Sequence, residues 1–159
     1  MTKPIQSPDI DVLSSKIGLK VVGIECLDSM PTKGDGYHRS LGYRLAFSDS
    51  SVLTLSLEDF EYEEGGEVYL IRTSDRFIEG SRWAVVDDIP SVISDSPIAF
   101  WEVITGCSQL FNDLGVPISP MYVVEEGVRF IYKGGSKLEF RPSSVSPSEA
   151  LTMNWSMPS

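Results

Sequence analysis

The chain has 159 residues, of which 23 are acidic and 13 are Lys or Arg, and its formal net charge at pH 7 is −10. Hydrophobic residues at 42% and charged residues at 23% are typical of a globular protein, which argues against global disorder. A strongly negative surface repels nucleic acid and anionic lipid and attracts basic partners. We therefore expect a domain with a real core that binds neither nucleic acid nor membranes.

Targeting segments are not expected. The first nine residues lack the apolar region of a secretory signal, and no stretch reaches the roughly 18 apolar residues of a membrane span. Cys26 and Cys107 lie far apart, each in an apolar stretch, which predicts two buried thiols and no disulfide. These features favour a cytoplasmic protein.

The first predicted element is a helix at about 7–17. Ser7 and Pro8 suit a helix start, and apolar residues then recur at three- and four-residue spacing. A strand is predicted at 19–27, followed by a loop at 28–40.

Alternation of apolar and polar residues predicts a β-hairpin over 43–57. A Ser-Asp-Ser-Ser turn separates its two arms, and both arms have the period of a half-buried strand. Residues rich in Val, Ile, Tyr and Trp predict further strands at 68–72 and 82–86. The polar stretch 87–97, which contains two prolines, is interpreted as a connector.

The second half of the chain repeats this order of elements. At a constant offset of 85 residues, Gly42-Tyr43-Arg44-Leu45-Ala46-Phe47 aligns with Gly127-Val128-Arg129-Phe130-Ile131-Tyr132. The stretch around Gly106 also resembles the one around Gly23. We interpret the match as two copies of a helix–strand–hairpin unit, at 7–57 and 96–141, that share one core. Two unrelated amphipathic hairpins would also resemble each other, because alternation is generic.

The end of the chain changes character. A strand is predicted at 121–124, ended by a turn at Glu125-Glu126-Gly127. After Arg141 the sequence becomes rich in Ser and Pro, so we expect a single domain at 1–141 and a C-terminal tail at 142–159. The fold class predicted for the whole chain is α+β, with a mainly antiparallel β-sheet and few short helices.

Motifs for catalysis or cofactor binding are missing from the sequence. The single histidine, His38, lies in the predicted Gly-rich loop, and there is no Gly-x-Ser-x-Gly elbow, phosphate loop or pair of Cys-x-x-Cys motifs. The acidic segments lack the spacing of a calcium loop. We therefore predict no catalytic residue, no metal site and no cofactor, although paired carboxylates of the glycosidase kind occur by chance in any acidic β protein.

The distribution of bases is the most informative pattern. Two windows, 45–71 and 83–128, contain no Lys or Arg, yet each holds seven acids. Charge arranged in such blocks produces a field of one sign rather than a mixed surface.

One segment of the first window combines acids with aromatic residues. We call it the acidic strip, and it comprises Glu58, Asp59, Phe60, Glu61, Tyr62, Glu63, Glu64 and Glu67. It is either a charged strand edge that prevents aggregation, or a recognition surface whose aromatic residues anchor a basic protein and whose carboxylates steer it. The predicted binding residues are those of the acidic strip, with Asp87, Asp88, Glu125 and Glu126 as an alternative face.

The chain resembles the immunity proteins of bacterial polymorphic-toxin and contact-dependent inhibition systems. It is similar to them in size, acidity and hairpin pattern, as in Gly42-Tyr43-Arg44-Leu45-Ala46-Phe47. The resemblance implies a tight complex with one toxin domain, whose active site the immunity protein occludes.

The sequence thus predicts a non-catalytic binding protein that neutralises a basic protein partner, in the manner of an immunity protein. Two alternatives stay open. A structural or assembly subunit of a phage or secretion system would self-associate, and a DNA-mimic inhibitor would space its carboxylates like phosphates.

Overall fold

The computed structural model describes residues 2–5, 10–27, 32–34, 37–61, 67–74, 83–87, 89–142 and 150–158. Within these residues the chain forms two sheets, in which nearly every strand pairing is antiparallel, and two short helices. The predicted α+β class with a mainly antiparallel sheet is confirmed.

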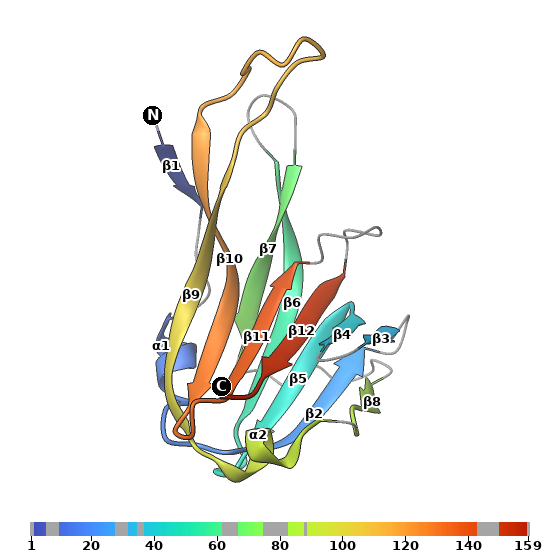
Figure 1. Cartoon of the computed structure of the whole chain (residues 1–159), viewed down its shortest axis with the longest axis vertical. Coiled ribbons are helices and arrows are strands. Elements are labelled where there is room, and N and C mark those ends of the chain that lie inside the picture. The colour runs from blue at the N-terminus through green and yellow to red at the C-terminus, as the bar shows by residue number, and fades with distance from the viewer. Residues whose placement is uncertain are drawn as a thin grey trace.

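The first sheet has five described strands in the order β7-β6-β5-β2-β8, and all its pairings are antiparallel (Figure 1). Leu53 and Leu55 on its inner face are fully buried, whereas Glu58 on the same strand is exposed. The strands are β2 (Val21–Leu27), β5 (Gly42–Phe47), β6 (Val52–Glu61), β7 (Glu67–Ser74) and β8 (Trp83–Val85).

The second sheet has seven described strands and is built around β10 (Met121–Tyr132). One edge of β10 pairs with β9 (Ile98–Ser108), and the other edge pairs with β1 (Thr2–Ile5) and with β11 (Lys137–Pro142). The sheet continues from β11 through β12 (Leu151–Ser156) and β4 (Tyr37–Ser40) to β3 (Thr32–Gly34). Of these pairings, that of β1 with β10 is parallel and the others are antiparallel.

The two sheets pack face to face around one core. The Tyr43 ring of β5 contacts the Phe140 ring of β11, with 5.4 Å between the ring centroids, and β7 packs against β10 and β11. The helices α1 (Ile10–Ser14) and α2 (Ser91–Asp95) lie at one end of the molecule (Figure 1), and Leu13 of α1 and Ile93 of α2 are fully buried. The helix predicted at 7–17 ends at Ser14 in the structure, its residues 7–9 lie outside the described residues, and the predicted connector at 87–97 contains α2.

The hairpins β5–β6 and β10–β11 have the same register. Leu45 lies opposite Leu53, and Phe130 lies opposite Leu138, at the positions 85 residues later. Each turn is closed by equivalent hydrogen bonds of 2.9 Å, in which Phe47 N donates to Ser51 O and Tyr132 N donates to Ser136 O. The offset on which the predicted repeat rests therefore pairs residues that occupy the same place in each hairpin.

The correspondence extends over four strands in each half. The meanders β2-β5-β6-β7 and β9-β10-β11-β12 are both antiparallel, and each first strand has a register shift near its beginning. Ile24 lies opposite Leu45, as Trp101 lies opposite Phe130. Ile24 thus corresponds to Trp101. The predicted match of Gly23 with Gly106 is wrong, because the two glycines occupy different register positions in their sheets.

The structure corrects the predicted C-terminal tail. Residues 151–156 form β12, a strand inside the second sheet, and Leu151 and Met153 are fully buried. These two residues alternate with Thr152 and Asn154, as in a half-buried strand. The Ser- and Pro-rich segment before them led to the prediction of a tail instead. The globular domain therefore extends beyond residue 141.

Three local expectations are also wrong. The predicted turn at 125–127 is a register shift within β10, which continues through it. His38 is not a loop residue, because it lies in β4 with 1% of its surface exposed. Cys26 is buried as expected, but Cys107 is exposed, and both are free cysteines.

Candidate functional site

The described part of the acidic strip lies at the end of the molecule opposite the two helices (Figure 1). Its residues 58–61 form the end of β6, and Glu67 begins β7, with Glu61 opposite Glu67 across the hairpin. Tyr62, Glu63 and Glu64 lie outside the described residues. The strip predicted from sequence is therefore partly placed, and its described backbone is the far part of one two-stranded ribbon (Figure 1).

Glu58 is the residue of the strip with a described ion pair. Arg72 on β7 lies next to it, with 2.5 Å between Arg72 Nη2 and Glu58 Oε2, and Arg72 Nε donates a hydrogen bond of 2.8 Å to the same oxygen. Both side chains are about half exposed, so the pair contributes little to stability. Arg72 is the first base after the window 45–71, and it neutralises an acid at the inner end of the strip.

Other arginines are held in ion pairs between neighbouring strands. Arg44 on β5 binds both carboxylate oxygens of Glu25 on β2, each at 2.9 Å from its Nη2 atom. At the equivalent place in the second half, Arg129 on β10 pairs with Glu102 on β9 at 2.5 Å and with Glu139 on β11. The hydrogen bond that Arg129 donates to Glu102 is the main cause that raises the pKa of Arg129. We interpret these pairs as structural, since they join strands within each sheet.

The β9–β10 hairpin ends in a segment that sequence reasoning did not single out. We call residues 109–120 the apolar loop, and it projects beyond the rest of the molecule (Figure 1). Asn112 organises it, because its Oδ1 atom accepts hydrogen bonds from Leu114 N at 2.9 Å and from Val116 N at 3.0 Å. Gly115 has a φ of 78°, a left-handed conformation that favours glycine.

The stem of the apolar loop is equally well hydrogen-bonded. Phe111 and Pro117 form a bridge, and Ile118 N donates to Leu110 O at 2.9 Å. Ser119 Oγ accepts a hydrogen bond of 2.9 Å from Leu110 N. The loop therefore has a defined conformation, although its large side chains face solvent. Their exposed fractions are 55% for Phe111, 87% for Leu114, 51% for Val116 and 50% for Ile118.

The described residues of the alternative acidic face predicted from sequence belong to different sheets. Glu126 lies at the register shift of β10, with its carboxylate beside Gly106 of β9, whereas Asp87 follows β8 in the other sheet. The structure describes Glu125 as part of β10, and Asp88 lies outside the described residues.

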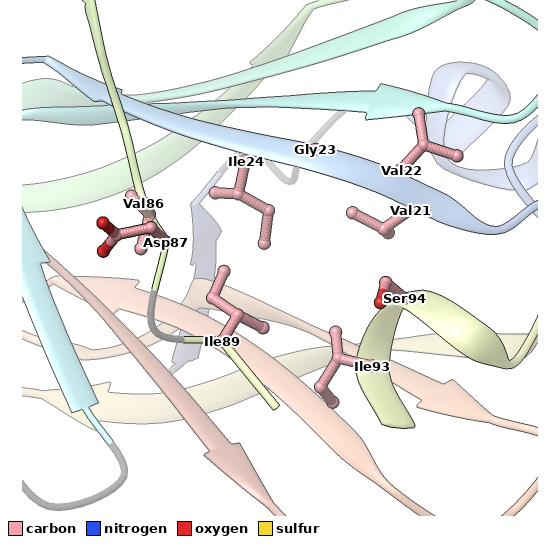
Figure 2. A pocket seen from close by; sticks show the side chains of 9 residues that line it. All are labelled: Val21, Val22, Gly23, Ile24, Val86, Asp87, Ile89, Ile93 and Ser94. Carbon is pink, nitrogen blue, oxygen red and sulfur yellow. The ribbon is translucent and has the colours of Figure 1, made fainter. Parts of the chain in front are cut away.

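Asp87 instead lines a small cleft beside β2. Figure 2 shows Val21 and Ile24 of β2 facing Ile89 and Ile93, with Asp87 near one end. The volume of the cleft is about 160 Å³. Sites for small molecules usually enclose roughly 300–1,000 Å³. The cleft is therefore too small to be the site of a cofactor or a substrate of ordinary size.

The buried polar groups of the core have structural surroundings. His38 Nδ1 lies 2.8 Å from the Tyr43 hydroxyl, and both residues are almost fully buried. Burial raises the pKa of Tyr43, so the phenol stays protonated. In the part of the chain that the structure describes, no three His, Cys, Asp or Glu side chains gather as metal ligands would, and no helix is long and apolar enough to cross a membrane.

Comparison of the chain with models of known protein families, with curated proteins and with solved structures gives no match.

Proposed function

We propose that this chain is a non-catalytic binding protein that neutralises a basic protein partner, and that it acts as an immunity protein by blocking a toxin domain. The observation that carries the proposal is the meeting of the two base-free windows in space. Strand β7 begins in the first window and packs against β10, most of which lies in the second.

The far ends of these strands thus form one acidic end of the molecule. Arg72 and Arg129 lie at the inner boundaries of the two windows, where both are ion-paired with acids. Among the described residues, β1 brings a base to this end, with Lys3 opposite Tyr122 of β10. The acids of the strip and Asp113 of the apolar loop still give this end an excess of negative charge.

An acidic end of this kind suits a partner that carries Lys and Arg around its active site. Opposite charge accelerates the encounter and selects the partner, and aromatic or apolar side chains at the same surface provide lasting contacts. The immunity role makes one further demand, which is that the complex abolishes the activity of its partner.

Growth of cells provides the test. The protein encoded by the neighbouring gene is expressed from a tightly controlled promoter, alone and together with this chain. We expect the neighbouring protein to arrest growth, this chain to restore growth, and the two purified proteins to form a complex that weakens as salt is raised. Absence of growth arrest, or rescue without a complex, would refute the immunity role.

A further inference from the structure

We propose that the apolar loop is the anchor of the complex, and that it enters an apolar groove rimmed by basic residues on a partner protein. This inference rests on the proposed function for the basic nature of the partner. Four large apolar side chains within eight residues are at least half exposed, namely Phe111, Leu114, Val116 and Ile118. Exposed apolar groups that lie together mark interaction sites more often than scattered ones do.

Hydrogen bonds already hold the loop in one conformation before any partner binds. The side chain of Asn112 holds the amides of Leu114 and Val116, and Asn112 N also donates to Val116 O at 2.9 Å. An ordered loop loses little conformational entropy when it binds, so more of its contact energy appears as affinity. A loop that only connected two strands would have no use for both order and exposed apolar groups.

The described body of the protein does not cover this loop, because the loop stands beyond the ends of the neighbouring strands (Figure 1). Since none of the described residues covers these side chains, we infer that another molecule buries them. Each large apolar side chain that passes from water into a groove contributes about 1.5–3 kcal/mol before the costs of association.

The charges around the loop favour one kind of binding partner over the others. Asp113 is the single charged residue of the apolar loop, and no Lys or Arg occurs between Arg82 and Arg129. Anionic lipid is therefore repelled, and a second copy of the chain would bring two acidic ends together. A protein groove with a basic rim complements both the apolar side chains and the carboxylates beside them.

Site-specific photo-crosslinking in the cell identifies the molecule that binds the apolar loop. A photo-reactive benzoylphenylalanine replaces Leu114 in one variant and Val85 in a control variant. Val85 of β8 is 73% exposed, so it matches Leu114 in exposure but lies far from the loop. We expect the reagent at position 114 to join this chain to a protein rich in Lys and Arg, through that protein's apolar residues, and the reagent at position 85 not to do so.

The partner that the crosslink identifies is then purified, and its affinity for variants of this chain completes the test. The variant Leu114→Asp should lower affinity at least about 30-fold, whereas Val85→Asp should lower it less than about twofold. Both positions are highly exposed, so both variants should fold. Crosslinks from position 114 to a second copy of the chain or to lipid alone would overturn the inference, as would equal affinities of the two variants.

The inference and the proposed function fail in different ways. If this chain rescues growth and Leu114→Asp keeps full affinity, the immunity role stands and the anchor is wrong. If position 114 joins a basic protein whose activity this chain leaves intact, the anchor stands and neutralisation is wrong.

Discussion

Single residues show why the two halves share sequence features. Gly42 and Gly127 begin the matching segments, and each faces a carbonyl of the neighbouring strand at the same place. A Cβ atom at Gly127 would lie 2.6 Å from Phe140 O, and one at Gly42 would lie 3.1 Å from Leu55 O. The close approach of the next strand therefore requires glycine at position 127 and leaves little room for a side chain at position 42.

These distances predict an order of stability. Gly127→Ala should lower the free energy of unfolding by about 3 kcal/mol, and Gly42→Ala by about 1 kcal/mol, because overpacking in a close-packed core forces atoms to shift. Gly23→Ala is the control, since nothing lies within 4 Å of its added Cβ atom. Urea unfolding measures all three, and a loss at Gly23 as large as that at Gly127 would contradict the explanation.

The arginine pairs differ in burial and so in their effect on stability. The side chain of Arg44 is 8% exposed and lies over the Trp83 ring as well as against Glu25, whereas that of Arg72 is 58% exposed. Arg44→Met should cost about 3 kcal/mol, because it leaves a half-buried carboxylate without its partner. Arg72→Met should cost less than about 1 kcal/mol. Equal shifts of the two urea midpoints would contradict this reading.

The burial of Tyr132 leads to a prediction of how the free energy of unfolding changes at alkaline pH. Burial raises its pKa, and its hydroxyl has no hydrogen-bond partner among the described residues. As pH rises above about 10, the unfolded chain loses a phenolic proton that the folded chain keeps, so the free energy of unfolding falls. Tyr132→Phe should reduce this fall by up to about 1.4 kcal/mol per pH unit.

The same variant has a control at neutral pH. There Tyr132→Phe should leave stability unchanged or raise it slightly, because the lost hydroxyl makes no described hydrogen bond. Tyr43→Phe should instead be destabilising, because its hydroxyl lies 2.8 Å from His38 Nδ1. Urea unfolding from pH 7 to pH 11 measures both effects, and an unchanged alkaline slope in Tyr132→Phe would count against the argument.

At the scale of elements, the hairpins were predictable because their signal is local. Alternation from Tyr43 to Phe47 determines the buried face of β5 without reference to the rest of the chain, and the same holds for β10 after Val128. Strand β12 was missed because a Ser- and Pro-rich segment precedes it. The continuation of β10 through Gly127 was missed because a glycine after two glutamates has the composition of a turn, and only the neighbouring strands show otherwise.

The apolar loop was missed for a different reason. Its sequence contains the turn residues Asn112 and Gly115 between apolar residues, which is a readable turn signal. Exposure, however, depends on the whole fold. Taken alone, four apolar residues within eight positions predict a buried segment. The acidic strip, in contrast, was visible as a charge pattern, although its role as a binding surface is still a prediction.

Asn112 allows the order of the loop to be tested apart from its contacts. Asn112→Ala removes the acceptor for two amides while keeping every exposed apolar side chain. The amides of Leu114 and Val116 should exchange with solvent at least about tenfold faster, with global stability nearly unchanged. Hydrogen exchange measures this, with Ser119→Ala at the stem as the comparison. Unchanged exchange at both amides would show that the backbone alone orders the loop.

At the scale of the whole molecule, the fold packs strands from two separate acid-rich, base-free stretches of sequence against each other. The windows 45–71 and 83–128 lie in different sheets over much of their length, and the packing of β7 on β10 brings them together. Charge counts alone predict a negative protein. The sandwich determines how the two windows lie together, and under the proposed function this sets the direction from which we expect a basic partner to approach.

This arrangement predicts the kinetics of binding. Neutralising three acids at the charged end, in Asp59→Asn, Glu61→Gln and Glu67→Gln combined, should slow association with the basic partner about tenfold at low salt, because steering raises association rates by roughly 10–10³-fold. The dissociation rate should change less, since charges at the edge of an interface act mainly on the encounter. Stopped-flow mixing at several salt concentrations measures both.

The control removes the same charge from the opposite end of the molecule. Asp11→Asn, Asp49→Asn and Asp95→Asn combined alter three exposed acids on or beside α1, the β5–β6 turn and α2. Both triple variants carry the same net charge, so a field that depended on total charge alone would slow them equally. We expect the variant of the acidic strip to lose most of the salt dependence and the control to keep it. Equal rates in the two variants would mean that the strip only protects a strand edge from aggregation.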